Sequence, residues 1–400
     1  MTRVCVTGIG VISAIGNNVQ ENWASIKNSR TGIGKAEIVQ TAYADQLPVG
    51  EIKLTNNQLA EALAIQQSQA YTRTALLGMH AAKQAIHDAF AADLPNNIAL
   101  ISATSVGGMD TSEEFYKVYR KDNAKGNVLR VATHDNADST EKIADFLGIR
   151  GIVSTISTAC SSSLNSIMYG ARLIKNAYTD CVLVGGTDAL TRFTINGFNS
   201  LMILDKEVCR PFDETRQGLN LGEGAGFLVL ESEARAKAAG KKIYGEIAGY
   251  GNACDAHHQT ATSPDGDGPY LAMKNALDTA NLDISSIDFI NAHGTGTGNN
   301  DLTEGTALKR LFGDHLPPFS STKAYTGHTL GAAGSIETIF SLLAMSNNCM
   351  LPNLNFSSAI SGLGLLPNTT LDELIINNLL TNSFGFGGND SSLILSKYTV

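Results

Sequence analysis

Residues 151–177, GIVSTISTACSSSLNSIMYGARLIKNA, change their pattern at a single cysteine. The segment GIVSTIS before Cys160 is typical of a strand, and SSSLNSIMYGARLI after it carries apolar residues at helical spacing. A cysteine at this junction lies at a helix N-terminus, where the helix dipole and free N–H groups stabilise a thiolate. The alternative is a small buried residue, because cysteine also packs as a hydrophobe in cores. Its place between strand and helix makes Cys160 a candidate nucleophile.

The alternation of strand and helix extends over the whole chain. RVCVTGIG, NIALISAT and CVLVGGT are strand-like, whereas ALLGMHAAKQAIHDAF has helical spacing. Such alternation predicts a layered α/β fold with largely buried sheets. The second half repeats the style with KIYGEIAGYG, IDFINAHG and SLILSKY around ETIFSLLAM, and its IAGYG echoes the VTGIG of the first half. We therefore expect two duplicated halves, residues 1–240 and 241–400, with the boundary near Gly240.

The composition argues against several classes of protein. The chain has 400 residues, of which 43% are hydrophobic and 17% charged, so it has ample material for large cores. Its formal net charge of -9, without a locally basic segment, argues against a nucleic-acid partner. Six cysteines without CxxC spacing indicate a reduced intracellular chain and argue against metal binding by cysteine.

The N-terminus does not indicate a secretion signal. Glycines interrupt the apolar run MTRVCVTGIGVISAIG, and its alternating Val4, Val6 and Ile9 suit a buried strand and turn. No apolar run approaches the ~20 residues that a membrane span needs, so we expect a cytoplasmic protein. The glycine clusters TGIGVISAIG and HGTGTGNND lack the spacing of nucleotide loops, which argues against an oxidoreductase.

Two of the eight histidines lie in glycine-rich segments. His293 in INAHGTGTGNND and His328 in STKAYTGHTLGAAGSIE are each flanked by glycine, so a backbone turn can present the ring into a cavity. Lys323 lies shortly before His328, and Glu304 follows His293. A lysine near paired histidines would keep them neutral by charge repulsion, and a glutamate would hold the lysine in place. Surface ion pairing is the alternative explanation of the lysine and the glutamate.

Five ordered segments resemble the β-ketoacyl-acyl-carrier-protein synthases, also called ketosynthases. They are TACSSS, CRPFDETRQGLNLGEGAG, HGTGTGNNDLTEG, STKAYTGHTLGAAGSIE and NSFGFGG. With the opening RVCVTGIGVISAIG, the likeness covers essentially the whole chain. The resemblance implies an elongating acyltransferase with a thiolase-like α-β-α-β-α fold made of two duplicated halves.

The resemblance also implies where the chemistry takes place. Cys160 would be the acyl-accepting nucleophile, and His293 and His328 the pair that stabilises the enolate as malonyl thioester loses carbon dioxide. Lys323 and Glu304 match the supporting lysine and glutamate of the family. These roles are chemically coherent, because neutral imidazoles can donate hydrogen bonds to a developing enolate oxygen beside a thioester electrophile.

Five further positions match substrate-binding residues of the family. They are Thr295 and Thr297, which would hydrogen-bond the pantetheine arm, Phe386, which would be an aromatic gate, and Val106 and Phe198, which would line the acyl pocket. The backbone N–H groups of Cys160 and Phe386 would form the oxyanion hole. The sequence does not decide whether a buried cation lies near Asn291 and Glu337.

The implied reaction is the decarboxylative Claisen condensation of an acyl chain on Cys160 with malonyl-acyl-carrier protein, in fatty-acid, polyketide or polyene biosynthesis. It requires no cofactor and no metal, and the phosphopantetheine arm of the acyl carrier protein carries the substrate. The family implies a homodimer, or a heterodimer with a chain-length-factor-like subunit. The rival is a non-catalytic chain-length partner, but such partners lack the cysteine. A thiolase would need a second cysteine near the C-terminus, where only Cys349 stands.

Three departures from the family pattern limit these expectations. After GFGG the family usually has a small or hydroxyl residue and then asparagine, but here Asn389 and Asp390 follow, so we expect different hydrogen bonds near the nucleophile. The loop 198–210 is shorter than in fatty-acid synthases of this type, which would reshape the carrier entrance. AIQQSQAYTRTALLGMH offers only Arg73 for carrier binding, although Arg210 also matches a basic position. Because carrier steering depends on local charge, these features favour a specialised condensing enzyme over housekeeping elongation.

Overall fold

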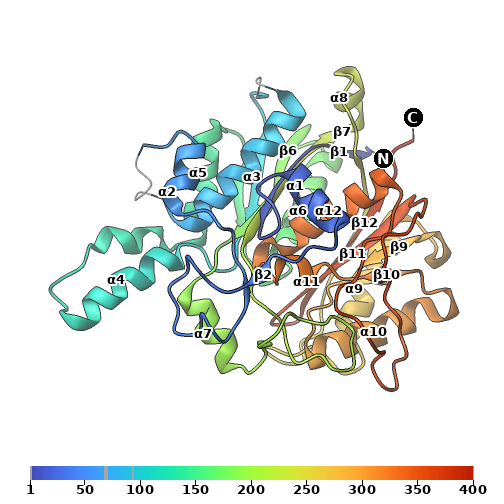
Figure 1. Cartoon of the computed structure of the whole chain (residues 1–400). Helices are drawn as coiled ribbons and strands as arrows, with labels where there is room; N and C mark the ends of the chain where they lie inside the picture. Colours follow the sequence, from blue (N-terminus) through green and yellow to red (C-terminus); the bar gives the residue numbers. More distant parts are fainter. Residues whose placement is uncertain (1, 67–70, 92–93, 400) are drawn as a thin grey trace.

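A computed structural model describes residues 2–66, 71–91 and 94–399 (Figure 1). Ten strands form one mixed sheet, which consists of β1 (Val4–Ser13), β4 (Ala99–Ala103), β5 (Val153–Ile156), β6 (Cys181–Asp188), β7 (Gly224–Ser232), β8 (Gly245–Cys254), β9 (Phe289–Asn291), β10 (Phe319–Ser320), β11 (Asn378–Gly385) and β12 (Asn389–Ser396). The strands β2 (Ile33–Gly34) and β3 (Val49–Gly50) form a separate pair. The α-helices are α1 (Val19–Lys27), α2 (Asn56–Ala62), α3 (Arg73–Phe90), α4 (Met109–Lys121), α5 (Asn136–Leu147), α6 (Ser162–Lys175), α7 (Arg192–Ser200), α8 (Glu233–Ala238), α9 (Asp267–Ala280), α10 (Gly298–Phe312), α11 (Lys323–Thr326) and α12 (Ala333–Asn347).

The large sheet repeats one five-strand arrangement twice. Its order is β10-β9-β11-β12-β8-β1-β7-β6-β4-β5, so both halves read 3-2-4-5-1 when their strands are numbered along the chain. In each half the fifth strand is antiparallel to both neighbours, while the second, third and fourth are parallel. The first strands of the two halves, β1 and β8, pair with each other. The predicted α/β fold of two duplicated halves is confirmed, and the boundary near Gly240 stays a prediction.

The similar segments VTGIG and IAGYG lie at equivalent positions, on the first strand of each half. A Cβ on Gly10 would lie 2.1 Å from the carbonyl oxygen of Ala81 in α3, and one on Gly251 would lie 2.1 Å from that of Ala272 in α9. Only glycine admits a helix this close to the strand. The repeated glycines therefore seat α3 on β1 and α9 on β8 in the same way.

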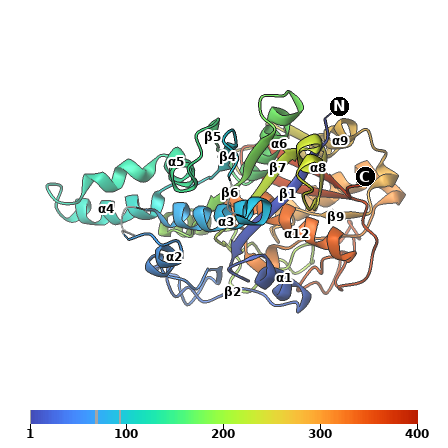
Figure 2. The same ribbon diagram turned by 90° about the horizontal axis from the view of Figure 1, so that it is seen from above.

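The helices α6 and α12 lie at the centre of the molecule (Figures 1 and 2). Every residue of α12 from Ala333 to Met345 is buried, as expected for a helix that is apolar all round. The N-terminal turns of the two helices meet, because the backbone N–H of Ser335 donates to Ser163 Oγ at 2.9 Å. This contact brings the segments that precede α6 and α12 together, and these segments carry Cys160 and His328.

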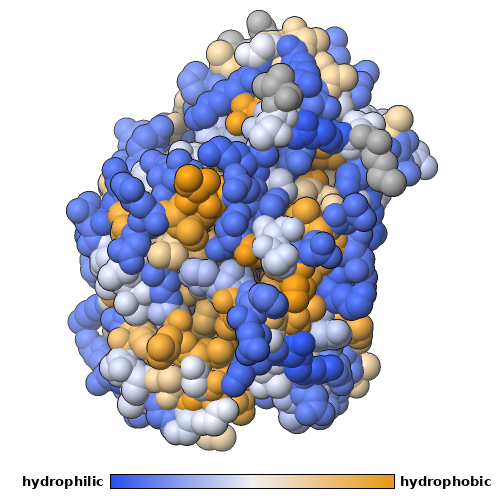
Figure 3. Space-filling model, turned by 90° about the vertical axis from the view of Figure 1, so that its right-hand side faces the viewer, coloured by the Kyte–Doolittle hydropathy of each residue, from blue (hydrophilic) through white to orange (hydrophobic). Residues whose placement is uncertain are grey.

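An arm made of α4 and the 3-10 helix η2 (Val128–His134) projects from the body (Figures 1 and 2). None of the residues in α4 and η2 is buried, and six large apolar side chains on the arm are exposed: Tyr116, Val118, Tyr119, Val128, Leu129 and Val131. The face of the molecule shown in Figure 3 carries several separate apolar patches among polar residues. Over the described ranges, no helix is both long and apolar enough to cross a membrane.

Candidate active site

Cys160 stands in a tight turn between β5 and α6. Ala159 before it has a φ of 52°, in the left-handed region that residues with a side chain rarely adopt. Two serines hold this turn: Ser105 Oγ donates to the carbonyl of Ala159 at 2.9 Å, and Ser383 Oγ donates to the carbonyl of Cys160 at 2.9 Å. Two other parts of the chain, which carry Ser105 and Ser383, therefore hold the turn that presents the thiol.

The protonation state of Cys160 differs from the expectation. Burial raises the pKa of its thiol to about 12, although the charge of Lys323 and the backbone N–H groups of Phe386 and Cys160 act in the opposite direction. The side chain is only 5% exposed, and α6 begins two residues later. Burial therefore outweighs the expected stabilisation of a thiolate at the helix start, and it favours the neutral thiol in the resting protein.

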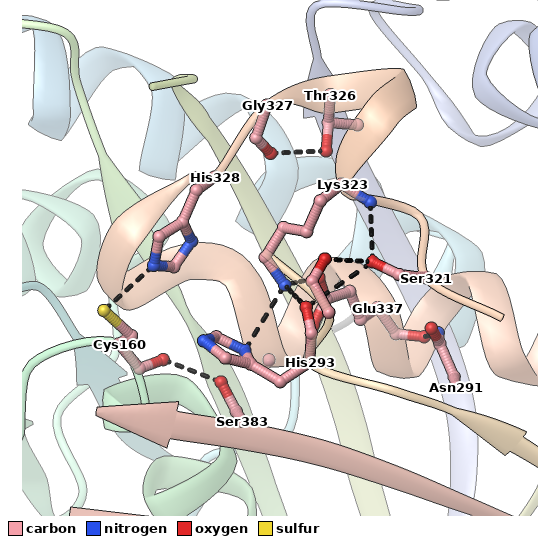
Figure 4. A network of polar contacts seen from close by, with 12 residues as sticks. Cys160, Asn291, His293, Ser321, Lys323, Thr326, Gly327, His328, Glu337 and Ser383 are labelled. Carbon is pink, nitrogen blue, oxygen red and sulfur yellow. Dashed lines mark hydrogen bonds and ion pairs between the residues drawn. The ribbon is translucent and has the colours of Figure 1, made fainter. Parts of the chain in front are cut away.

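Two histidines face the thiol in the arrangement of Figure 4. His328 Nε2 lies 2.9 Å from Cys160 Sγ, and the rings of His293 and His328 are 5.3 Å apart at their centroids with an interplanar angle of 84°. His293 follows β9, and His328 follows α11. The structure thus places the cysteine and both glycine-flanked histidines in one site.

Burial and the charge of Lys323 keep both rings neutral. Its Nζ lies 3.4 Å from Nδ1 of His293 and donates to the backbone carbonyl of His293 at 2.9 Å. Burial first, and then the charge of Lys323, lower the pKa of His293 and His328 well below the usual value. A lysine that donates to Nδ1 of a neutral imidazole leaves the proton on Nε2, so His293 presents an N–H group to the cavity.

The glutamate that pairs with Lys323 is Glu337 of α12, and the expectation that Glu304 does so is wrong. Lys323 Nζ forms a buried ion pair with Glu337 Oε1 (Figure 4). The carboxylate of Glu304 instead accepts from the backbone N–H groups of His293 (2.9 Å) and Gly294 (2.8 Å). Glu304 therefore holds the loop that carries His293, and Glu337 holds the lysine.

A narrow cavity of about 120 Å³ leads to the three reacting side chains. Besides Cys160, His293 and His328, its lining includes four of the five predicted substrate-binding residues, Thr295, Thr297, Phe198 and Phe386. The rings of Phe198 and Phe386 stack at 5.6 Å. Val106 is not part of this lining, but it packs in the same apolar cluster as Phe198. The lining thus combines aromatic and aliphatic side chains with threonines.

The two predicted carrier-binding arginines lie in different environments. Arg73 is only 6% exposed and forms a buried ion pair with Glu223, with N···O distances of 2.6 and 2.8 Å. The prediction that Arg73 contacts a carrier protein is therefore wrong, because its guanidinium group is buried and paired with Glu223. Arg210 remains partly exposed and pairs with Asp205 and Glu207 at 3.4 Å each.

Asp188 is a buried residue that was not predicted from the sequence as part of the site. Its carboxylate accepts from the backbone N–H groups of Ser105 (2.9 Å), Val106 (3.1 Å) and Gly331 (2.7 Å). It thereby ties a loop beside the Cys160 turn to the segment before α12. The signal was an aspartate at the end of the buried strand CVLVGGTD. Within the described residues, no group of three or more His, Cys, Asp and Glu side chains could hold a metal ion.

Comparisons with known proteins agree with this geometry. A 3-oxoacyl-[acyl-carrier-protein] synthase 2 of Staphylococcus aureus is 34% identical over 412 residues, covering 99% of this chain and 98% of that protein. The solved structure of the ishigamide ketosynthase/chain length factor has a TM-score of 0.94 at 32% identity, covering all of both chains. The solved structure of a type II polyketide synthase acyl-carrier protein in complex with its ketosynthase (AntDE:AntF) has a TM-score of 0.89 at 27% identity, covering 99% of this chain and 100% of that chain.

The family comparison covers most of the sequence. The Beta-ketoacyl synthase N-terminal domain matches residues 1–236, and the Beta-ketoacyl synthase C-terminal domain matches residues 244–357. Together with the match to ketosynthase structures over the full chain, these family matches identify the fold as thiolase-like. The chain belongs to the β-ketoacyl synthase family.

Proposed function

We propose that this chain condenses an acyl group held on Cys160 with malonyl-acyl-carrier protein, releasing carbon dioxide and β-ketoacyl-acyl-carrier protein. The observation that carries the proposal is the contact of 2.9 Å between Cys160 Sγ and a neutral His328, beside a second neutral histidine at the end of a narrow cavity. A nucleophile within hydrogen-bond reach of a base is the arrangement that acyl transfer requires.

The first step moves the acyl group onto Cys160. The thiol sulfur attacks the thioester carbonyl of the incoming acyl carrier, and the carbon–sulfur bond to the pantetheine arm breaks. The thiol proton must reach the departing pantetheine sulfur, and Nε2 of His328 lies where it can relay that proton. The N–H groups of Cys160 and Phe386 both approach the sulfur, so they are placed to hold the negative charge on the carbonyl oxygen.

The second step generates the carbon nucleophile. Malonyl thioester loses carbon dioxide, and the resulting enolate oxygen accepts a hydrogen bond from Nε2–H of His293. His328 can support the same oxygen after a change of tautomer, because Nε2 is unprotonated when it accepts the thiol proton and must carry a proton to donate to the enolate. Nδ1 has no hydrogen-bond partner among the described residues, so no contact there holds the ring in one tautomer. The enolate carbon then attacks the acyl carbonyl, and the carbon–sulfur bond to Cys160 breaks. The departing thiolate takes up a proton from solvent, which replaces the one that left with the pantetheine thiol.

The pantetheine arm of the carrier would pass the threonines of the cavity lining. Thr295 and Thr297 lie within 2.9 Å of each other through their hydroxyl groups and line the cavity together. Their hydroxyls can hydrogen-bond the amides of the arm, whereas Phe198 and Phe386 face the acyl chain. No redox or metal cofactor has a part in this reaction. Carrier-bound substrates and six free cysteines fit a cytoplasmic enzyme.

The surface supports a two-chain assembly. β5 is an edge strand of the sheet, and its Val153 is 40% exposed. The arm of α4 and η2 also exposes apolar side chains. An unpaired edge with exposed apolar side chains is suited to pairing with a second chain. The partner is either a second copy or a chain-length-factor-like subunit, and the similarity to the ishigamide proteins favours the latter and a specialised pathway. This chain is the catalytic member, because it keeps Cys160, both histidines and Lys323.

The test is acyl loading followed by mass spectrometry of the intact protein. Acyl-acyl-carrier protein should add one acyl mass to the unaltered chain and none to Cys160→Ala. Cys254→Ala is the matched control, because Cys254 is the exposed cysteine and should not affect loading. Equal acyl mass on Cys160→Ala would contradict the assignment. For the second step, His293→Ala should slow carbon dioxide release from malonyl-acyl-carrier protein, and an unchanged rate would refute its role.

A further inference from the structure

Asn389 joins the turn of the nucleophile to the turn of Phe386. It is the first residue of β12 and directly follows the turn 386–388. Its side-chain oxygen accepts from Ser161 Oγ at 2.8 Å, from Asn165 Nδ2 at 2.9 Å and from Asn252 Nδ2 at 3.0 Å. Two of these donors belong to the start of α6, and the third lies on β8. One amide oxygen therefore collects hydrogen bonds from both halves of the fold.

The two turns that Asn389 joins are also the two that supply the backbone N–H groups at the sulfur. A Cβ on Gly385 would lie 3.0 Å from the carbonyl oxygen of Thr158 and 3.3 Å from the backbone nitrogen of Cys160, so the backbones are closely apposed. Ser383, three residues before Phe386, binds the carbonyl of Cys160, and Asn389, three residues after it, binds Ser161. The turn of Phe386 is thus attached to the nucleophile turn on both sides.

The amide donors keep the Asn389 oxygen oriented. Ser161 Oγ has one proton and also lies 2.7 Å from the carbonyl of Thr158, so this proton is divided between two acceptors. Asn165 and Asn252 donate to Asn389 independently of that choice, and Ser391 Oγ in turn donates to Asn165 Oδ1 at 3.0 Å. Loss of the Asn389 oxygen would remove the acceptor that links the partly buried donors of Ser161 and Asn165 to the turn of Phe386, and would free the two turns to move apart.

We propose that Asn389 is a positioning residue that sets the spacing of the Cys160 and Phe386 N–H groups. The inference rests on the proposed condensation, in which these groups stabilise the oxyanion formed during acyl transfer and carbon–carbon bond formation. Decarboxylation depends on His293 and His328 and not on this spacing. A defect in Asn389 should therefore separate the two half-reactions, which a general loss of folding would not do.

The experiment compares acyl loading with decarboxylation in Asn389→Leu, which keeps the size and removes the acceptor. Because loss of one oxyanion donor costs about 10²–10³ in rate, a displaced donor should slow acyl loading by at least about tenfold. Carbon dioxide release from malonyl-acyl-carrier protein should stay within about twofold of the unaltered rate. Asn389→Asp, which keeps the acceptor position, should recover most of the loading rate. Asn378→Ala at the far end of the same hairpin is the control, since Asn378 accepts from Ser396 away from the site.

The outcomes separate this inference from the proposed function. Unchanged loading in Asn389→Leu, or an equal fall in loading and decarboxylation, would overturn the positioning role. Acyl mass on Cys160→Ala would overturn the proposed function instead. If Asn389→Leu does not fold, as judged by circular dichroism, Ser161→Ala removes the donor next to the nucleophile and should show the same selective loss of loading, whereas normal loading would refute the inference.

Discussion

Asp390 is a buried carboxyl group whose ionisation should control stability. Its side chain is 0% exposed, and neither oxygen has a hydrogen-bond partner among the described residues. Burial, followed by the charges of Asp255 and Glu304, raises its pKa to about 8 from an ordinary value of 3.8. Asp390 is therefore protonated in the folded protein at neutral pH, whereas the same group is ionised in the unfolded chain.

The sign of the pH dependence follows from this difference. Between about pH 4 and pH 8 the folded state binds a proton that the unfolded state lacks, so the free energy of unfolding falls as the pH rises. The stabilising contribution is complete below about pH 4 and is lost as the pH rises through about 8. A full proton is worth about 1.4 kcal/mol per pH unit, so the loss between pH 5 and pH 8 is on the order of 3–4 kcal/mol. Asp390→Asn should remove this loss.

The assay is urea unfolding followed by circular dichroism at pH 5, 6, 7 and 8. The difference in unfolding free energy between Asp390→Asn and the unaltered protein should grow steadily with pH. Asp314→Asn is the matched control, because Asp314 is exposed and its replacement should leave the pH dependence as it is. The reasoning would be refuted if Asp390→Asn and the unaltered protein lost stability in parallel from pH 5 to pH 8.

Two further predictions concern the site and the duplicated fold. Lys323→Met removes the charge that helps to lower the pKa of His293, so that pKa rises and the acid limb of the pH profile for carbon dioxide release should move to higher pH. Lys323→Arg keeps the positive charge and should leave the acid limb of this pH profile unchanged. An unchanged acid limb in Lys323→Met would show that the charge of Lys323 does not lower the pKa of His293. Gly10→Ala and Gly251→Ala each push a Cβ to 2.1 Å from a helix carbonyl and should each cost about 1–3 kcal/mol or more in urea unfolding. Gly197→Ala, which meets nothing within 4 Å, should cost little, and similar stability of all three variants would argue against the close packing.

The parts that the sequence predicted share a physical cause. Cys160, His293 and His328 each follow a short strand or helix and lie in or next to a turn of small residues. Strand alternation and helical spacing are local signals, and the site arises where those elements end. The duplication was also visible, because VTGIG and IAGYG record the same close contact between a strand and a helix in each half.

The parts that the sequence did not predict depend on contacts between distant residues. Glu337 lies in a helix that reads as apolar, and nothing in its neighbourhood marks it as the partner of Lys323. Glu304 has the glycine-rich context of a site residue, yet its carboxylate binds backbone N–H groups. Arg73 begins an amphipathic helix, and its burial depends on Glu223, which lies 150 residues away in the chain. Local pattern does not reveal which long-range charge will meet which partner.

The departure from the family pattern at residues 389–390 affects two different parts of the molecule, because successive side chains of a strand point to opposite faces. Asn389 faces the turn of Cys160 and collects three donors, while Asp390 faces the interior beside Glu304. The sequence predicted that hydrogen bonds near the nucleophile would differ from those of the family. In the structure, Asn389 makes such hydrogen bonds at the nucleophile, whereas the side chain of Asp390 on the other face of the strand makes none with the described residues. A change at Asn389 should appear in the rate of acyl transfer, and a change at Asp390 should appear in the pH dependence of stability. The two substitutions can therefore be separated by measurement although the residues are neighbours in the chain.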